Sequence, residues 1–322
     1  MDTNTMRTLE EFTTELADSL KATMKQDYGL SVEPEPHLVQ KTNVEKQGIT
    51  VRFNDSNIAP TVYVEDLYQM YQEGTPIPEI AEKLSKTVLK AHDESPKLPV
   101  LTPEEAKKHI TLTLVNTELN QQMLEHTPHM EILGGELSAI PRWYISEEAS
   151  FIVSNDMASR LMMTPDEVIR VGQDNINSQH FEAKPMREIL MEMMGGDYMD
   201  MIPPMEGPEM IVLSSETKIQ GSRAILSDEA LNHVHNMIGD YVILPSSIHE
   251  LICVPISDDM KPEELRAMVH DINGSQVAPE ERLSDNIIKY DGQKLSLVGD
   301  SFKMETPKED IHMESHSMRF AM

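Results

Sequence analysis

The sequence is poor in cysteine, in aromatic residues and in basic residues. Its 322 residues include 1 cysteine, Cys253, which excludes an internal disulfide and every paired-cysteine metal or redox motif. The neighbours of Cys253 in the stretch LICVP are apolar, so we expect its thiol to be a small buried group. Aromatic residues number 6 Phe, 8 Tyr and 1 Trp, against 24 Met, so methionine is expected to fill part of the core.

The shortage of basic residues sets the charge of the chain. With 27 basic and 55 acidic residues, the formal net charge is −28. Such a surface repels phosphate backbones and anionic lipid headgroups, so we expect no direct binding to nucleic acid or to a membrane. The charge favours solubility. With nucleic acid and membranes excluded as partners, another protein is the expected partner. A more specific interpretation is an acidic mimic that blocks a nucleic-acid-binding enzyme, although no long acidic run supports it.

Long apolar runs are also absent. No stretch approaches the roughly 20 apolar residues that a membrane-spanning helix needs. The opening MDTNTMRTLEEFTTEL has no basic segment followed by an apolar core, so no secretory signal is expected. A bacterial-type cytoplasmic protein is the natural prediction.

Several motifs of known chemistry are missing. The sequence has no glycine-rich phosphate loop, no HExxH zinc motif and no GxSxG nucleophile turn. His249 and Glu250 are followed by Leu-Ile-Cys, so the zinc-peptidase pattern fails at its second histidine. His233 and His235 are two positions apart on a predicted helix and cannot share one ion, since their side chains point about 200° apart. We therefore expect neither a metal ion nor a nucleotide cofactor.

Residues 1–92 are predicted to form a small module with the order helix, strand, strand, helices. A capping box of Thr8 and Glu11 opens the first helix, and Gly29 ends it. Extended segments follow at 37–42 and 48–54, and a helix begins after the pair Thr75-Pro76.

A Pro-rich polar linker is predicted at 93–107, a larger domain at 108–299 and a loose tail at 300–322. Strands in the larger domain come in consecutive pairs with helices between them, which favours an α+β fold with a mostly antiparallel sheet and flanking helices. The pair Asp291-Gly292 between two extended runs predicts a tight hairpin. The predicted strands of this domain are 110–116, 129–133, 137–145, 150–154, 209–215, 223–227, 240–244 and 249–256.

The stretch YVILPSSIHEL, residues 241–251, carries the candidate site. Pro245, Ser246 and Ser247 interrupt two apolar runs, and His249 and Glu250 follow. In a strand, His249 and Glu250 face opposite sides, so they cannot be a base and its orienting acid. Ser247 and His249 can share a face, and a Ser–His catalytic pair would then need a distant acid.

Asp156, in VSNDMASR, and Asp228 are candidates for that acid. The alternative is that residues 245–250 form only the corner of a β-hairpin, in which serine hydroxyls bind nearby backbone amides. In that case His249 would hold the corner in shape.

The sequence also resembles a known family. The stretches YVILPSSIHELICVP, AILSDEALNHVHNMIG and FIVSNDMASRLMM, with RTLEEFTTEL and VNTELNQQML, are similar to an uncharacterised family of anaerobic gut bacteria. That family is catalogued only as a domain of unknown function, and the similarity covers nearly the whole chain. A second uncharacterised bacterial family is distantly similar across the second domain. The resemblance implies a cytoplasmic bacterial protein, sometimes encoded near mobile elements, and brings no activity or catalytic residue.

The sequence thus supports three hypotheses about function. The first is a non-enzymatic acidic protein that acts by contact with another protein, as an accessory or regulatory factor. The second is a hydrolase that uses Ser247 and His249, with Asp156 as the acid. The third is the acidic mimic. Only the third requires the carboxylates to gather on one face.

Overall fold

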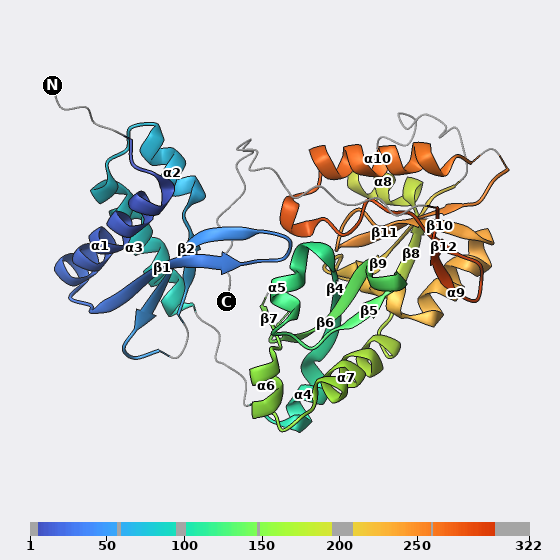
Figure 1. Ribbon diagram of the computed structural model, residues 1–322, viewed down its shortest axis with the longest axis horizontal. Coiled ribbons are helices and arrows are strands. Elements are labelled where there is room, and N and C mark those ends of the chain that lie inside the picture. The colour runs from blue at the N-terminus through green and yellow to red at the C-terminus, as the bar shows by residue number, and fades with distance from the viewer. Residues whose placement is uncertain are drawn as a thin grey trace. The chain divides into compact units, whose positions relative to one another are not determined.

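The computed structural model describes residues 6–56, 59–94, 101–146, 149–194, 209–258 and 260–299. The chain divides into two compact units, and the division falls between residues 99 and 100 (Figure 1). The described strands form three sheets in which every pair of neighbouring strands is antiparallel. With helices packed on these sheets, the predicted α+β class is confirmed.

The first unit is a three-stranded sheet with helices on one face. Its elements are α1 (Leu9–Tyr28), β1 (Val32–Gln40), β2 (Glu45–Phe53), β3 (Thr61–Tyr63), α2 (Glu65–Gln72) and α3 (Ile77–Asp93), in the sheet order β1-β2-β3. Phe12, Leu16 and Leu20 of α1 pack with Ile49 and Val51 of β2 in one buried cluster. The apolar residues of α1 recur every three or four positions, which places them on the side of the helix that faces the sheet.

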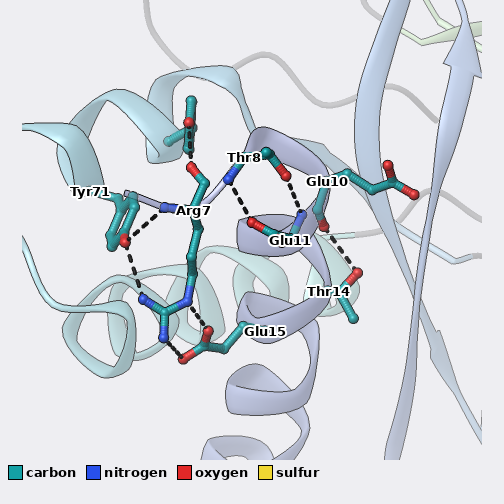
Figure 2. Close-up of polar contacts among 8 residues, drawn as sticks. Arg7, Thr8, Glu10, Glu11, Thr14, Glu15 and Tyr71 are labelled. Carbon is teal, nitrogen blue, oxygen red and sulfur yellow. Dashed lines mark hydrogen bonds and ion pairs between the residues drawn. The ribbon is translucent and has the colours of Figure 1, made fainter. Parts of the chain in front are cut away.

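The N-terminus of α1 is fixed by its own side chains, as Figure 2 shows. Thr8 accepts a hydrogen bond from the amide of Glu11, and the Glu11 carboxylate accepts one from the amide of Thr8 at 2.9 Å. Arg7 donates to the hydroxyl of Tyr71 at 3.1 Å and pairs with Glu15, which ties the start of α1 to α2. Gly29 ends the helix with φ 68°. The predicted start and end of this helix are both confirmed.

The module contains a third strand that the sequence did not indicate. β3 spans only Thr61–Tyr63 and lies at the edge of the sheet, so it has too few residues for a period-two pattern. β1 is also longer than predicted, because it includes Pro34 and Pro36. Proline is tolerated there since β1 is an edge strand, where an amide that faces outward needs no partner.

The second unit begins with a small sheet and its helices. These elements are α4 (Pro103–His109), β4 (Ile110–Asn116), η1 (Glu118–Asn120), α5 (Gln121–Leu124), β5 (Met130–Ile132), η2 (Leu133–Gly135), β6 (Leu137–Tyr144), β7 (Ser150–Ile152), α6 (Asn155–Arg160) and α7 (Pro165–Asn177). The strands follow the order β4-β6-β5, and β7 also pairs with β6. Thr164 and Glu167 form a capping box at the start of α7.

A six-stranded sheet makes up the rest of the unit, in the order β13-β12-β10-β11-β9-β8. Its elements are β8 (Phe181–Pro185), α8 (Met186–Met194), β9 (Ile211–Ser215), η4 (Gly221–Leu226), α9 (Asp228–Ile238), β10 (Tyr241–Leu244), β11 (Glu250–Pro255), α10 (Pro262–Ser275), η5 (Pro279–Glu281), β12 (Ile288–Tyr290) and β13 (Leu295–Leu297). Figure 1 shows α10 on one side of this sheet and α9 on the other.

Two buried clusters occupy the two faces of the six-stranded sheet. On one face, strand residues such as Ile243 and Leu251 pack with Leu231 of α9 and with Leu112 and Leu137 of the small sheet. The second, smaller cluster comes from the opposite face and from α10, and its buried members are Val242, Leu244, Val254, Val269 and Ile287. The two sheets of the second unit therefore share one core, whereas we expected a single sheet.

Three other predictions need correction. Residues 223–227, predicted as a strand, lie mostly in the 3₁₀ helix η4, since a short fully buried run cannot be told from a helix by its pattern. Residues 103–107 of the predicted linker form α4, which Thr102 caps. The hairpin at Asp291-Gly292 exists, but its turn is longer than the tight turn predicted. Tyr290 pairs with Leu295, so residues 291–294 form the loop, and the Asp291 carboxylate accepts hydrogen bonds from the amides of Gln293 and Lys294.

Methionine fills less of the core than expected. Among the described residues, Met24 is the one methionine with a fully buried side chain. Other methionines pack as partly buried residues at the margins of the clusters, namely Met70, Met123, Met130, Met157, Met163, Met210 and Met260. Branched aliphatic residues therefore dominate the core.

Two further expectations concern the tail and membrane-spanning helices. The predicted tail at 300–322 lies beyond the described residues. Of the helices that the structure describes, none is both long and apolar enough to cross a membrane.

The division into two units generates a prediction for limited proteolysis. We expect trypsin or proteinase K to cut first between α3 and α4, at residues 93–103, because a Pro-rich polar stretch there separates two independent cores. Mass spectrometry of the fragments checks this. A chain that resists cutting in this stretch, while other loops are cleaved, would instead indicate one fused domain.

Candidate functional site

The strands on both sides of the candidate corner are those predicted. β10 and β11 pair antiparallel, with Val242 opposite Val254 and Leu244 opposite Ile252. Val242, Leu244, Leu251 and Cys253 are all buried, with exposed fractions of at most 3%. The corner is therefore held between two well-packed strands in the middle of the six-stranded sheet.

The corner itself is not a tight turn. Leu244 is opposite Ile252, so the chain from Pro245 to His249 loops away from the hairpin. Its backbone pairs instead with residues 281–284. The amide of Ile248 donates to the carbonyl of Glu281 at 2.9 Å, and the carbonyls of Pro245 and Ser246 accept from the amides of residues 284 and 283. This second pairing satisfies the backbone groups that a tight turn would have used.

The Ser247 hydroxyl and the His249 ring are bound to different groups. Ser247 Oγ accepts a hydrogen bond from the backbone amide of His249 at 3.1 Å. His249 Nδ1 accepts from the backbone amide of Gln220 at 3.3 Å, and its Nε2 lies 3.3 Å from Glu281 Oε1. Because Nδ1 accepts, the ring proton is on Nε2 and points to the Glu281 carboxylate. Among the described contacts, no hydrogen bond joins the Ser247 hydroxyl to the imidazole.

The remaining predicted site residues lie apart from this pair. Asp156 is exposed in the first turn of α6, and no described contact joins it to Ser247 or His249. Glu250 is exposed at the start of β11, opposite Ser214 of β9. Asp228 is in the first turn of α9. The acid nearest to the imidazole is Glu281, which the sequence did not suggest because it is 32 positions away in the chain.

A second loop supports the corner from the other side. The His249 carbonyl accepts from Ser214 Oγ at 2.8 Å and from the amide of Gly221 at 3.0 Å. A Cβ at Gly221 would overlap the Ser214 hydroxyl and the His249 carbonyl oxygen, so only glycine fits there. The side-chain oxygen of Gln220, the residue before Gly221, accepts a hydrogen bond from the Thr113 hydroxyl of β4. The corner is thus one node in a network that joins both sheets of the second unit.

A buried polar run next to the corner also escaped the sequence analysis. Ser284, Asp285 and Asn286 are at most 3% exposed, directly before β12. Asp285 Oδ2 lies 2.8 Å from Nδ1 of His270 on α10, and the exposed fractions of the two side chains are 4% and 45%. Ser284 Oγ donates to the carboxylate of Glu136. The sequence feature that could have indicated this buried run is three consecutive polar residues placed just before an apolar strand.

A buried carboxylate that orients a half-exposed imidazole is the arrangement found beside general bases. Among the described nucleophilic side chains, Ser284 and Cys253 are not placed for such chemistry. The Ser284 hydroxyl is bound to Glu136, and Cys253 belongs to the cluster on the face of the sheet opposite α10. Burial also raises the pKa of the Cys253 thiol, so the thiolate does not form near neutral pH.

The histidines considered for metal binding have other surroundings. His233 is exposed on α9, and His235 Nε2 lies 3.1 Å from Asp240 Oδ1 with its ring edge against Tyr290. No group of three or more His, Cys, Asp or Glu side chains in the described segments could hold a metal ion.

Comparison with known proteins identifies the chain only at the level of a family. The model of a family of unknown function, DUF5688, matches residues 9–292, which includes both units. Neither the curated proteins nor the solved structures contain a match to the chain.

The geometry of the corner predicts a modest structural effect for His249. His249→Ala should lower the free energy of unfolding by about 1 kcal/mol, since it leaves the amide of Gln220 without its partner. Chemical denaturation with a control variant, His233→Ala, measures this, and the exposed His233 should change stability little. A His249→Ala protein as stable as the control would mean that the imidazole does not hold the corner.

The close packing at Gly221 predicts a larger effect. Gly221→Ala should cost about 3 kcal/mol or more, because its Cβ would push Ser214 away from the corner. Gly274→Ala is the matched control. Gly274 lies in α10 with open space around it, so alanine should stabilise the protein by about 0.5 kcal/mol. Melting temperatures of the two variants that shift in the same direction would contradict this account.

Proposed function

The chain belongs to the family of unknown function DUF5688, and from that premise we propose that it is a binding protein that acts through contact with another protein. The observation that carries the proposal is the exposed side of α1. Glu10, Glu11, Thr14, Glu15 and Asp18 line a shallow hollow there. Four of these five side chains are carboxylates, which suits a lysine or arginine of a partner.

Two of the four carboxylates are available to a partner. Glu11 caps the helix and Glu15 pairs with Arg7, so these two are engaged within the chain. Glu10 and Asp18 have no side-chain partner among the described residues, and Figure 2 shows the Glu10 carboxylate pointing away from the helix. α1 is anchored to α2 through Arg7 and Tyr71 and to the sheet through its apolar face. A rigid surface of this kind binds without a large ordering cost.

The proposal treats the corner at 245–250 as structural. Both nitrogens of the His249 ring and the Ser247 hydroxyl have partners that fix backbone geometry. A hydrolase would need Ser247 to donate to an imidazole nitrogen with a lone pair to spare, and Nδ1 uses its lone pair for the amide of Gln220. The hypothesis of an acidic mimic is similar to our proposal, since a mimic also uses carboxylates. A mimic, however, must present carboxylates across a whole face of the protein.

We further propose that the partner is a basic protein of the bacterial cytoplasm and is neither a nucleic acid nor a membrane. The net charge of −28 supports this choice because anionic polymers and surfaces are repelled. The resemblance to a family of anaerobic gut bacteria, sometimes encoded near mobile elements, makes such a bacterium the host in which to search.

The test compares two variants with the same change in charge. Glu10→Lys with Asp18→Lys alters the proposed surface and leaves the helix cap and the Arg7 pair in place. Asp174→Lys with Asp271→Lys alters two exposed acids on α7 and α10. Affinity capture from the host, read by quantitative mass spectrometry, should yield a basic protein with the wild type and the α7/α10 variant. The α1 variant should capture about tenfold less of this protein, or less still.

Salt provides a second readout of the same contact. Capture should weaken as sodium chloride rises, because screening shortens the range of attraction between exposed charges to about 3 Å at 1 M. Equal capture by both variants would overturn the assignment to α1. A measured hydrolysis that Ser247→Ala abolishes, at an unchanged melting temperature, would overturn the binding function itself.

A further inference from the structure

Arg142 and Arg223 of the second unit are two arginines that have no acidic partner among the described residues. Arg142 lies on β6 and Arg223 on η4, and neither is within ion-pair distance of a carboxylate in the described structure. Arg223 is 7% exposed and Arg142 is partly buried. This is unexpected in a chain with 55 acidic and 27 basic residues, where a carboxylate is the most available neighbour.

Both guanidinium groups lie beside one tyrosine. Arg223 Nη1 donates to the Tyr144 hydroxyl at 3.2 Å, and its guanidinium carbon is 5.4 Å from the centre of the Tyr144 ring. Arg142 is two positions before Tyr144 on β6 and therefore shares its face. Its Nη1 donates at 3.0 Å to Ser150 Oγ, and Ser150 is the residue opposite Tyr144 on β7. The two cations are thus gathered around Tyr144.

Several polar atoms of this group are buried without a hydrogen bond. They are Nε of Arg142, Nε of Arg223 and Oγ1 of Thr111, which is opposite Arg142 on β4. A buried charge without a counter-ion is costly even after the protein and nearby water have relaxed around it. The same burial lowers the pKa of the Arg142 guanidinium from its usual value. Native structures rarely retain such groups unless another species satisfies them.

The face that carries these residues is partly exposed to solvent. Side chains alternate along β6, so Trp143 points into the cluster formed with α4, α6 and α7. Arg142 and Tyr144 point to the other face, where Ser150 and Ile152 of β7 are also partly exposed. Leu124 of helix α5 packs on this face against Val115 and Ile140, and Ile152, opposite Arg142, lies beside this cluster.

We propose that Arg142 and Arg223, together with the hydroxyls of Tyr144 and Thr111, form a binding site for a phosphate group. Two guanidinium charges match the charge of a phosphate, which is about −1.5 to −2 near neutral pH. The guanidinium fork presents paired donors with the geometry of phosphate oxygens, and neutral hydroxyls complete the shell. The site is independent of the acidic surface of α1, since it lies in the other unit.

Inorganic phosphate is the probe for the test, used with the full-length protein at constant ionic strength. Sodium phosphate should raise the melting temperature in a saturable way, by roughly 4 °C at about tenfold excess over the dissociation constant. Sodium chloride at equal ionic strength should not. Sodium acetate distinguishes a phosphate site from a general carboxylate site. Isothermal titration with phosphate provides the stoichiometry, which should be about one per chain.

Variants connect the effect to the two arginines. Arg142→Met with Arg223→Met should abolish the response to phosphate. Without phosphate, this variant should melt at the wild-type temperature or above, because an unpaired buried charge is replaced by an apolar chain of similar length. Arg160→Met, on the exposed side of α6, is the control and should keep the full response. Arg223→Lys retains one charge but loses the fork, and should weaken phosphate binding about tenfold.

Three outcomes would overturn the proposal. The first is a phosphate response no larger than that of chloride. The second is an undiminished response in both the Met and the Lys variants. The third is an acetate response equal to that of phosphate, which would make the site one for carboxylates. If the Met variant is less stable than the wild type in the absence of phosphate, the arginines have a structural role. Titration of the Lys variant with phosphate then decides the proposal, and undiminished binding by this variant would overturn it.

Discussion

The backbone of residues 281–286 is the segment on which the second unit depends. It pairs with the corner at 245–248, and so holds the loop between the two central strands of the six-stranded sheet. The carbonyl of Leu283 accepts from Asn116 at the end of β4, and Asn273 of α10 donates to the carbonyl of Ser284. One short irregular segment therefore fastens both sheets and α10 to each other. Because its polar groups are buried, each must keep its partner, which makes the segment specific as well as stabilising.

This network explains why so many polar residues lie near the corner. In a core built mostly of branched aliphatic side chains, apolar packing alone does not fix how two sheets are placed against each other. Hydrogen bonds are directional, and those from Thr113 of β4 to Gln220 and from Asn116 of β4 to the carbonyl of Leu283 connect the small sheet to the loops around the corner. A Ser–His–acid combination of residue types is thus present near the corner, but the Ser247 hydroxyl and the His249 imidazole bind different groups in the described contacts.

Charge is distributed with a different logic in the two units. The exposed side of α1 carries four carboxylates, two of which have no described side-chain partner. In the second unit, Arg142 and Arg223 offer positive charge beneath a partly exposed sheet face. The net charge of the chain does not reveal this difference, because it counts every charge equally. The buried cations are few, but solvent and salt weaken their interactions less than those of the exposed acids.

The sequence by itself determined the local elements. The capping boxes at Thr8 and Thr164, the left-handed stop at Gly29 and the apolar run Tyr241–Leu244 all depend on neighbours within a few positions. The family relation was also carried by the sequence alone. Only the tertiary structure decided that residues 223–226 are helical, that the corner pairs with 281–284, and that Glu281 lies beside His249. These outcomes depend on groups tens of positions apart, and nothing in a local pattern states which distant backbone amide will reach a given carbonyl or imidazole.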